Sequence, residues 1–533
     1  MAASNYAKPV RQLADLKSIP APTGGLNARD GLMGMQPDQA ITLTNFFPTR
    51  RGAQLRLGWG KHSTVPAISP PTPAVRPPVE SLMNYAGTNG AERLFAAAGG
   101  KVYDVTARNT APVEQLTGLG NARWQYTMMT NAFNNFLVMV NGVNVPQKFN
   151  GSVWSDCVLT SLDVSFDPRK LIHVHLVHRR LWFTEVNSTK AWYLPVDEVQ
   201  GSCKLFSTGE LFPRGGFLQC IKSWTVDSAI GSDDRTVFIS SEGDVAIYSG
   251  FDPEDADLFS LDGIYRVGAT LGRRCAEKYG SDLLILCEDG AMPLTQILSQ
   301  SRLLEPVPLT DMIQLKFSDD VALYSNNFGW AISVCYRTNQ LYLNVPAAQE
   351  YRQYVMNTVT GAWCEFTGYN GICWSLLNSE IYFGRPDGII GNGWYGVLDA
   401  YDYTDQRGGS INGTALGAFT YMGKGAYQKH ITMARANMQA PTEPQMRLSV
   451  AVDFETEDVS PPIPPASIAY LPALWDQALW DQAKWGASVR VFKRWFGVGR
   501  MGFCAAPFLK LSTGFGMLWI GTDFQVLEGQ GML

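Results

Sequence analysis

A short hairpin-like pattern that recurs through the middle of the chain limits its possible folds more than any other feature. Each copy is a run of four or five apolar residues, a turn with Gly, Asn or Asp, and a second apolar run. Turns of the N-G, D-G and G-G type between β-branched or aromatic runs predict hairpins, because these turns need positive φ angles. The copies begin at residues 94, 136, 181, 236, 283, 341 and 381.

The spacing of these copies indicates how the hairpins are assembled. Successive copies begin roughly 40 to 60 residues apart, and a hairpin-bearing unit of this period is typical of a four-stranded propeller blade. The spacing is irregular, and neither a W-D nor a kelch signature repeats, so stacked β-sandwiches are the alternative. We therefore predict an all-β fold with a β-propeller-like central domain.

Composition shifts divide the chain into three predicted parts. Residues 1–80 are rich in Gly and Pro and end in "VPAISPPTPAVRPPVE", whose prolines fix φ and lack the donor that a β-ladder needs. We expect an extended N-terminal segment and a Pro-rich linker there. Residues 81–400 are predicted to form the propeller-like domain, and residues 401–533 a β-rich C-terminal domain with longer strands and a Trp-repeat loop.

Composition also excludes some classes of protein. The chain has 533 residues, a formal charge of −5 and only 17% charged residues, which argues against binding nucleic acid through a basic face. Its 46% hydrophobic and 12% aromatic content suits surfaces that meet other proteins. The nine Cys are scattered without a C-x-x-C pair, so we expect reduced, mostly buried thiols. No apolar run approaches the length that a membrane-spanning helix needs, so no membrane insertion is predicted.

The sequence contains none of the common catalytic or cofactor-binding motifs. The chain lacks a nucleophile elbow, a P-loop, an H-E-x-x-H helix and a dinucleotide fingerprint. "HVHLVH" holds His173, His175 and His178, but a strand places only the first two on one face, so the three cannot converge on a metal. We expect these histidines to be outward-facing polar positions of a strand. The sequence therefore predicts no enzyme activity, no cofactor and no metal site.

A short repeat near the C-terminus spaces three tryptophans five residues apart. In "LWDQALWDQAKWG" these are Trp475, Trp480 and Trp485. Five residues place side chains on different faces of either a helix or a strand, whereas an Asp after each of the first two Trp can set an Asx turn. Two interpretations follow: a clamp within the C-terminal domain, or an anchor for a neighbouring subunit, since Trp is favoured at interface hot spots.

The stretch "TNFFPTRRGAQLRLGW", residues 44–59, predicts a hairpin that begins with "AITLTNFF", ends its first strand at Pro48 and turns at Gly52. It follows a Gly-Gly pair and a P-D-Q-A step. In this order the segment resembles the opening of podovirus tail nozzle proteins (tail tubular protein B) and of related phage tail hub and DNA-stabilisation proteins. The W-D repeat is also similar to repeats in phage structural proteins. The resemblance covers residues 19–62 plus that run and does not extend to residues 80–400.

The resemblance implies a structural virion protein of a short-tailed phage, made in the host cytoplasm and located in the virion tail. Such a subunit forms a homo-oligomeric ring, usually of six copies, that binds a tail adaptor and tail fibres or spikes, and double-stranded DNA passes through it without sequence-specific binding. In this interpretation Arg50, Arg51 and Arg56 meet acceptors on a neighbouring subunit. The alternative is a propeller-type tail protein that binds or degrades host glycans.

Overall fold

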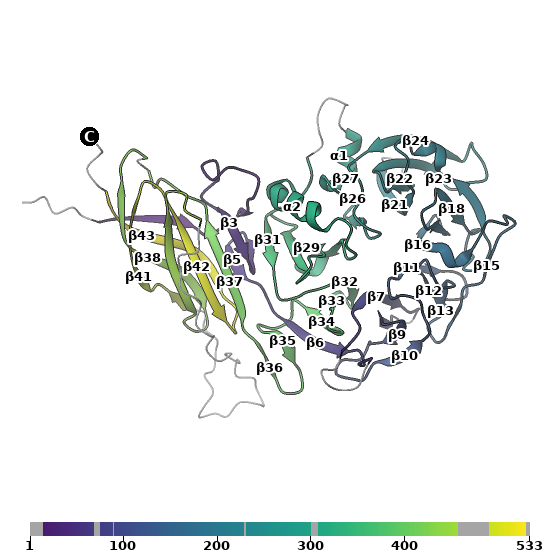
Figure 1. Cartoon of the computed structure of the whole chain (residues 1–533), viewed down its shortest axis with the longest axis horizontal. Coiled ribbons are helices and arrows are strands. Elements are labelled where there is room, and N and C mark those ends of the chain that lie inside the picture. The colour runs from purple at the N-terminus through teal and green to yellow at the C-terminus, as the bar shows by residue number, and fades with distance from the viewer. Residues whose placement is uncertain are drawn as a thin grey trace, which may run out of the picture. The chain divides into compact units, whose positions relative to one another are not determined.

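The computed structural model describes residues 14–68, 75–88, 90–228, 231–299, 307–423, 425–456 and 490–528. The fold is all-β, with 53% strand and 6% helix, as predicted. It divides into two compact units. Unit 1 comprises residues 1–56, 360–365 and 410–533, and unit 2 comprises residues 57–359 and 366–409. Figure 1 shows the elements of both units.

Unit 2 is a β-propeller-like ring of small antiparallel sheets (Figure 1). The first two sheets are β7 (Val79–Ala86), β8 (Glu92–Ala98), β9 (Lys101–Asp104) and β10 (Val113–Leu116), then β11 (Gln125–Thr130), β12 (Asn135–Val140), β13 (Gln147–Phe149) and β14 (Trp154–Asp156). The next two are β16 (Leu171–Val177), β17 (Arg180–Glu185), β18 (Lys190–Tyr193) and β20 (Lys204–Ser207), then β21 (Leu218–Ser228), β22 (Gly231–Ser240), β23 (Asp244–Gly250) and β24 (Phe259–Arg266).

Three further sheets complete the ring. They are β25 (Ala276–Tyr279), β26 (Asp282–Cys287) and β27 (Gly290–Pro293); β28 (Ala331–Cys335), β29 (Gln340–Val345) and β30 (Arg352–Asn357); and β32 (Cys373–Leu377), β33 (Glu380–Gly384) and β34 (Ile389–Gly393). The first strands contact one another in the order β7, β11, β16, β21, β25, β28, β32 and back to β7. Helices α1 (Leu294–Ser299) and α2 (Gln314–Tyr324) lie between the fifth and sixth sheets along the chain.

The predicted hairpins are confirmed, since each of the copies overlaps the second strand of one sheet. Local turn chemistry explains why. Gly99 and Gly100 join β8 to β9 with φ of 56° and 75°, the conformation that a G-G step predicts. His178 and Arg179 join β16 to β17 with φ of 48° and 60°. His178 therefore belongs to a turn and not to the strand that carries His173 and His175.

Apolar clusters fill the spaces between neighbouring sheets. One cluster, around Trp182, packs the third sheet against the fourth, and its aromatic rings meet edge to face, stacked or tilted. Others join the first sheet to the second, the second to the third, and the last to the first. Because apolar burial contributes about 25 cal/mol per Å², these clusters make the sheets that they join depend on one another for stability.

The last sheet of the ring contains strands from distant parts of the chain. The strand β6 (Trp59–Thr64) pairs antiparallel with β34 and is followed in the sheet by β35 (Asp399–Asp402) and β36 (Arg407–Gly409). Gly58 precedes β6, and a Cβ at this position would overlap the Leu398 carbonyl oxygen. The guanidinium of Arg108 lies 4.3 Å from the Tyr403 ring centroid. The contacts of Gly58 and β6 with residues 389–398 thus join the first residues of unit 2 in the sequence to some of its last.

Unit 1 consists of two sheets in which N-terminal strands pair with C-terminal ones. One contains β1 (Asp15–Pro20), β4 (Phe46–Thr49), β5 (Gly52–Leu55), β38 (Lys429–Ala440), β40 (Arg490–Phe492), β41 (Trp495–Gly502) and β43 (Leu518–Glu528). The other contains β2 (Gly25–Leu26), β3 (Gln39–Thr44), β37 (Ile411–Gly417), β39 (Gln445–Val452) and β42 (Ala505–Thr513), with residues 363–365 of β31 (Trp363–Phe366) beside β3.

The predicted division at residues 80 and 400 therefore needs correction. Residues 14–56 do not form a separate extended segment, because their strands are built into the sheets of unit 1. β6 belongs to unit 2 although it precedes residue 80. The physical reason is that an edge strand is stabilised by whichever strand completes its hydrogen bonds, and that partner lies hundreds of residues away in the sequence.

Candidate functional site

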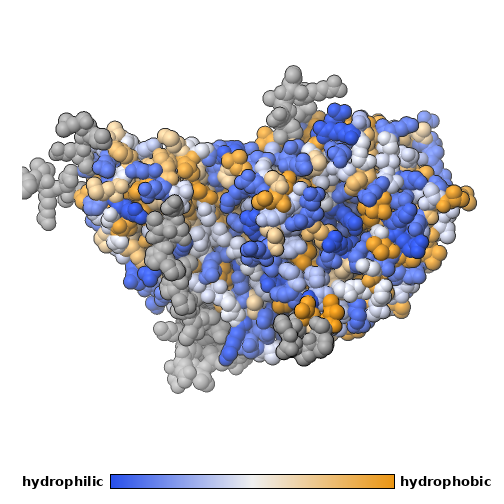
Figure 2. All heavy atoms as spheres, viewed as in Figure 1, coloured by the Kyte–Doolittle hydropathy of each residue, from blue (hydrophilic) through white to orange (hydrophobic). Residues whose placement is uncertain are grey.

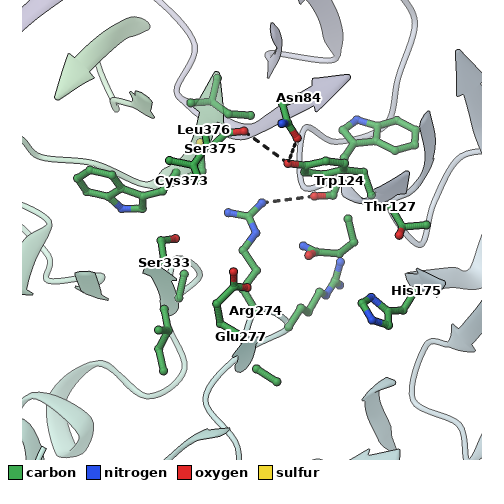
Figure 3. A pocket seen from close by; sticks show the side chains of 18 of the residues that line it. Asn84, Trp124, Thr127, His175, Arg274, Glu277, Ser333, Cys373, Ser375 and Leu376 are labelled. Carbon is green, nitrogen blue, oxygen red and sulfur yellow. Dashed lines mark hydrogen bonds between the residues drawn. The ribbon is translucent and has the colours of Figure 1, made fainter. Parts of the chain in front are cut away.

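The inner strands of unit 2 surround a cavity of about 400 Å³, which we call the central cavity (Figure 3). Its size falls in the range of small-molecule pockets. All the inner strands contribute, and the lining combines aromatic, polar and charged side chains. The lining includes Asn84, Trp124, Tyr126, His173, His175, Lys222, Arg273, Arg274, Glu277, Trp374 and Ser375.

Arg274 is the best-positioned cation of the central cavity. Its Nη2 donates hydrogen bonds to the Glu80 carbonyl oxygen at 2.9 Å and to Ser81 Oγ at 2.8 Å. The guanidinium also lies 5.2 Å from the Phe328 ring centroid. Burial lowers the pKa of Arg274. No salt bridge joins this side chain to a described residue, so its positive charge is not neutralised by a carboxylate in direct contact.

A tyrosine hydroxyl and two small polar side chains form a second fixed group in the central cavity. Tyr126 Oη donates to Asn84 Oδ1 at 3.0 Å and lies 3.4 Å from Ser375 Oγ. These contacts connect β7, β11 and β32, and Figure 3 draws dashed lines that end at Asn84 and Ser375. Burial raises the pKa of Tyr126, so the hydroxyl stays protonated and acts as a hydrogen-bond donor.

His173 and His175 face the central cavity, which corrects the expectation that they point outward. They share one face of β16, as predicted, and their ring centroids lie 6.3 Å apart. The expectation failed because β16 is an inner strand of the ring. The face that carries both histidines therefore lines the central cavity. Burial lowers the pKa of both imidazoles well below the usual range, and Lys222 lowers both further. Both rings are therefore neutral at pH 7.

The low pKa of His173 predicts a pH-dependent stability. Above pH 6.5 His173 is mostly unprotonated in both the folded and the unfolded protein. As the pH falls below 6.5, His173 is protonated first in the unfolded chain, so the free energy of unfolding falls until the pH reaches the pKa of the folded protein. We expect the His173→Asn variant to lose less stability than the wild type as the pH falls below 6.5. Urea midpoints of unit 2 at pH 7.5, 6 and 5 measure it, and equal pH slopes for variant and wild type would contradict it.

Glu277 and Lys222 add one negative and one positive charge to the central cavity. Burial raises the pKa of the Glu277 carboxyl, and Lys222 opposes that shift. Glu277 acts on stability in the opposite direction to His173, because the folded state binds its proton first as the pH falls. No group of three or more His, Cys, Asp or Glu in the described ranges is placed to hold a metal ion.

The predicted interface residues fall into different environments. Arg50 and Arg51 form the turn between β4 and β5 and are exposed. Arg56 is only 2% exposed, and its Nε donates to Asn45 Oδ1 at 2.8 Å. The expectation that Arg56 meets a neighbouring subunit is corrected, because its guanidinium is enclosed within its own chain. Trp475, Trp480 and Trp485 lie outside the described residues.

Sequence reasoning did not find the residues of the central cavity other than the two histidines. Arg273 and Arg274 follow Gly272 directly, and this G-R-R step was the available local signal. The prediction of reduced, mostly buried cysteines is confirmed for burial, since all nine are free and buried. Cys220 and Cys275 lie on adjacent inner elements with their sulfurs 3.6 Å apart.

Comparisons with known proteins return fold-level similarity only. No family model matches the chain, and no curated protein matches it. A solved structure titled BBS1N in complex with ARL6DN is 12% identical, with 63% of this chain and 97% of that chain covered and a TM-score of 0.41. The computationally designed Ika8 protein is 8% identical, with coverage of 64% and 98% and a TM-score of 0.33. YCF48 bound to D1 peptide is 10% identical, with coverage of 62% and 97% and a TM-score of 0.36.

None of the helices in the described residues has both the length and the apolar character needed to cross a membrane.

Proposed function

We propose that this chain is a structural subunit of a short-tailed phage tail, a nozzle or hub protein that assembles into a homo-oligomeric ring, with six copies favoured. Genome DNA would leave through the lumen between the copies, and a tail adaptor and tail fibres or spikes would attach to the ring. The chain itself would carry out no catalysis. The central cavity of one chain is not this lumen, because 400 Å³ accommodates only a small molecule.

The observation that carries the proposal is the opening segment, whose order of motifs resembles that of the tail nozzle and hub proteins. In this chain the segment forms β2 to β5 and presents Arg50 and Arg51 at an exposed turn, where a partner can reach them. Large apolar side chains are also exposed, with Phe133 93% and Leu162 98% accessible. On the face in Figure 2, hydrophobic residues form small groups among hydrophilic ones.

The mass of the assembly tests this proposal. We expect native mass spectrometry of the full chain at micromolar concentration to show a ring, alone or on addition of the tail adaptor, because subunits of such a ring pack permanently. Arg50→Glu with Arg51→Glu should shift the population to monomer, since two buried charge reversals at an interface each cost several kcal/mol. Circular dichroism should be unchanged.

A matched charge reversal serves as the control. Arg490→Glu with Lys493→Glu changes the same number of exposed cations at a different place in unit 1 and should leave the ring intact. A chain that stays monomeric with every tail component, or a control that dissociates the ring equally, would contradict the proposed role of the β4–β5 turn.

The central cavity supports a second candidate, a glycan-binding or glycan-degrading tail protein. Trp124 and Trp374 offer apolar rings, and Tyr126 and Glu277 offer hydrogen-bonding groups, the combination that ligand pockets use. In this case the isolated chain should bind or depolymerise host polysaccharide, and Glu277→Gln should abolish that activity. Ring formation without polysaccharide binding would favour the structural role.

A further inference from the structure

Unit 2 has a second hollow, of about 420 Å³. We call it the arginine hollow. Arg273 lines both spaces. The arginine hollow has two cationic side chains and several neutral polar ones, and no Asp or Glu lines it. Its lining is Arg123, Ile172, Val186, Asn187, Phe217, Gln219, Gly272, Arg273, Ser325, Asn326, Asn327 and Phe328.

The guanidinium of Arg273 has no acceptor among the residues that the structure describes. No hydrogen bond or salt bridge joins it to a described residue, and its Nη1 is buried without a partner. Burial lowers the pKa of Arg273, and the nearby charges of Arg123 and Arg274 lower it further. A buried, unpaired donor and like charges in proximity both destabilise the folded state. An anion at this point would remove both penalties.

The neighbouring arginines are held in place by other contacts. Arg123 Nε donates to Glu80 Oε1 at 3.0 Å, and its guanidinium lies 4.4 Å from the Phe328 ring centroid. Arg274 approaches the same ring and is bonded to β7 through Ser81. Glu80 is thus the one carboxylate that ion-pairs with this cluster among the described residues, and it leaves two positive charges without a counter-ion.

The backbone before Arg273 is fixed by a conformation that only Gly adopts readily. Gly272 has φ of 70°, in the left-handed region, and the strand β25 begins four residues later. Of the two arginines that follow this turn, Arg273 lines both spaces and Arg274 lines the central cavity. The planar fork of an arginine matches the oxygens of a carboxylate or phosphate group.

We propose that the arginine hollow binds a small molecule through a compact oxyanion group, with Arg273 as the principal ligand-binding residue and Arg123 as its charged neighbour. Asn187 and Gln219 provide neutral hydrogen-bonding groups at the same site. The ligand is of the carboxylate or phosphate class, and the hollow is large enough for more than the anionic group alone. This inference is independent of the proposed tail function, because it concerns a site within a single chain.

Isothermal titration calorimetry of the full chain with inorganic phosphate tests the proposal, with ionic strength held constant by chloride. We expect saturable binding of one phosphate per chain and competition by sulfate, which has the same shape. Arg273→Gln should weaken binding by about tenfold or more, because it removes the charge-assisted donors, and Arg273→Lys should weaken it less. Arg50→Gln, an equal change of charge at an exposed turn, should bind phosphate as the wild type does.

Three results would overturn the proposal. They are no saturable heat with the wild-type chain, unchanged binding by Arg273→Gln, and an equal loss in Arg50→Gln. Arg273 is the residue to change because it makes no hydrogen bond to a described residue, whereas replacing Arg274 would break its bonds to β7. If the Arg273→Gln variant folds poorly, the wild-type titration with sulfate competition still tests whether the chain binds an oxyanion.

Discussion

Asn45→Ala is expected to destabilise unit 1 by about 3 to 4 kcal/mol. Asn45 lies between β3 and β4, where the chain passes from one sheet to the other, and it has φ of 61°. Its Oδ1 accepts from Arg56 Nε at 2.8 Å, and its Nδ2 donates to the Asn412 carbonyl oxygen at 2.8 Å. Alanine removes both bonds, takes an acceptor away from a buried cation and adopts a positive φ at a cost.

Two further variants separate these causes. Asn45→Gly tolerates the positive φ but removes the side-chain bonds, and we expect it to cost about 2 kcal/mol. Asn45→Asp keeps an acceptor for Arg56 and should cost least. Hydrogen exchange of peptides that cover β3 to β5 measures the effect in unit 1, with peptides of unit 2 as the internal reference. Protection of β3 to β5 that stays within about 0.5 kcal/mol of the wild type in the alanine variant would refute this explanation.

Gly58→Ala is expected to destabilise unit 2 by about 4 kcal/mol or more. The added Cβ overlaps backbone atoms of Leu398, which cannot rotate away as a side chain could. Separating the two segments breaks hydrogen bonds between Trp59 N and the Leu398 oxygen, at 3.1 Å, and between Tyr395 N and the Gly58 oxygen, at 2.9 Å. The effect should spread from β6 to β34, because these strands pair in the last sheet.

Hydrogen exchange also measures this prediction, with β6 and β34 as the reporting peptides. Gly31→Ala is the control, since a Cβ at that position meets no heavy atom within 4 Å. The control should change stability by no more than about 0.5 kcal/mol. Equal exchange rates at β34 in the Gly58 variant and in the control would show that the pairing of β6 with β34 does not stabilise the ring.

Local rules of sequence predict the parts of this fold that depend on neighbouring residues. The G-G step at Gly99 and Gly100 needs only its own backbone preferences, and the resulting hairpin is where the pattern places it. His173 and His175 share a face for the same reason. Their direction could not be predicted, because the inner side of β16 becomes a cavity wall only after the ring closes.

Long-range pairing explains the failures. Arg56 reads as an exposed hairpin cation, and its burial depends on an Asn at a left-handed position eleven residues earlier and on strands from the other end of the chain. The central cavity combines residues from Leu82 to Ile381, and no local pattern connects them. The predicted divisions at residues 80 and 400 failed because they follow changes in composition. The two units are instead set by strand pairing between distant segments of the chain.

The pairing of β1 with β43 has a consequence for synthesis. Ser18 donates to Asp523 across 505 positions of the chain. The sheet of unit 1 that contains β1 therefore cannot be completed until β43 has left the ribosome. The strands of unit 2 are all made earlier, with its final β-strand complete at Gly409. During translation β1 therefore waits as an unpaired strand, because the strand it pairs with is β43, and a nascent chain truncated before residue 518 should need a holding chaperone to stay monomeric.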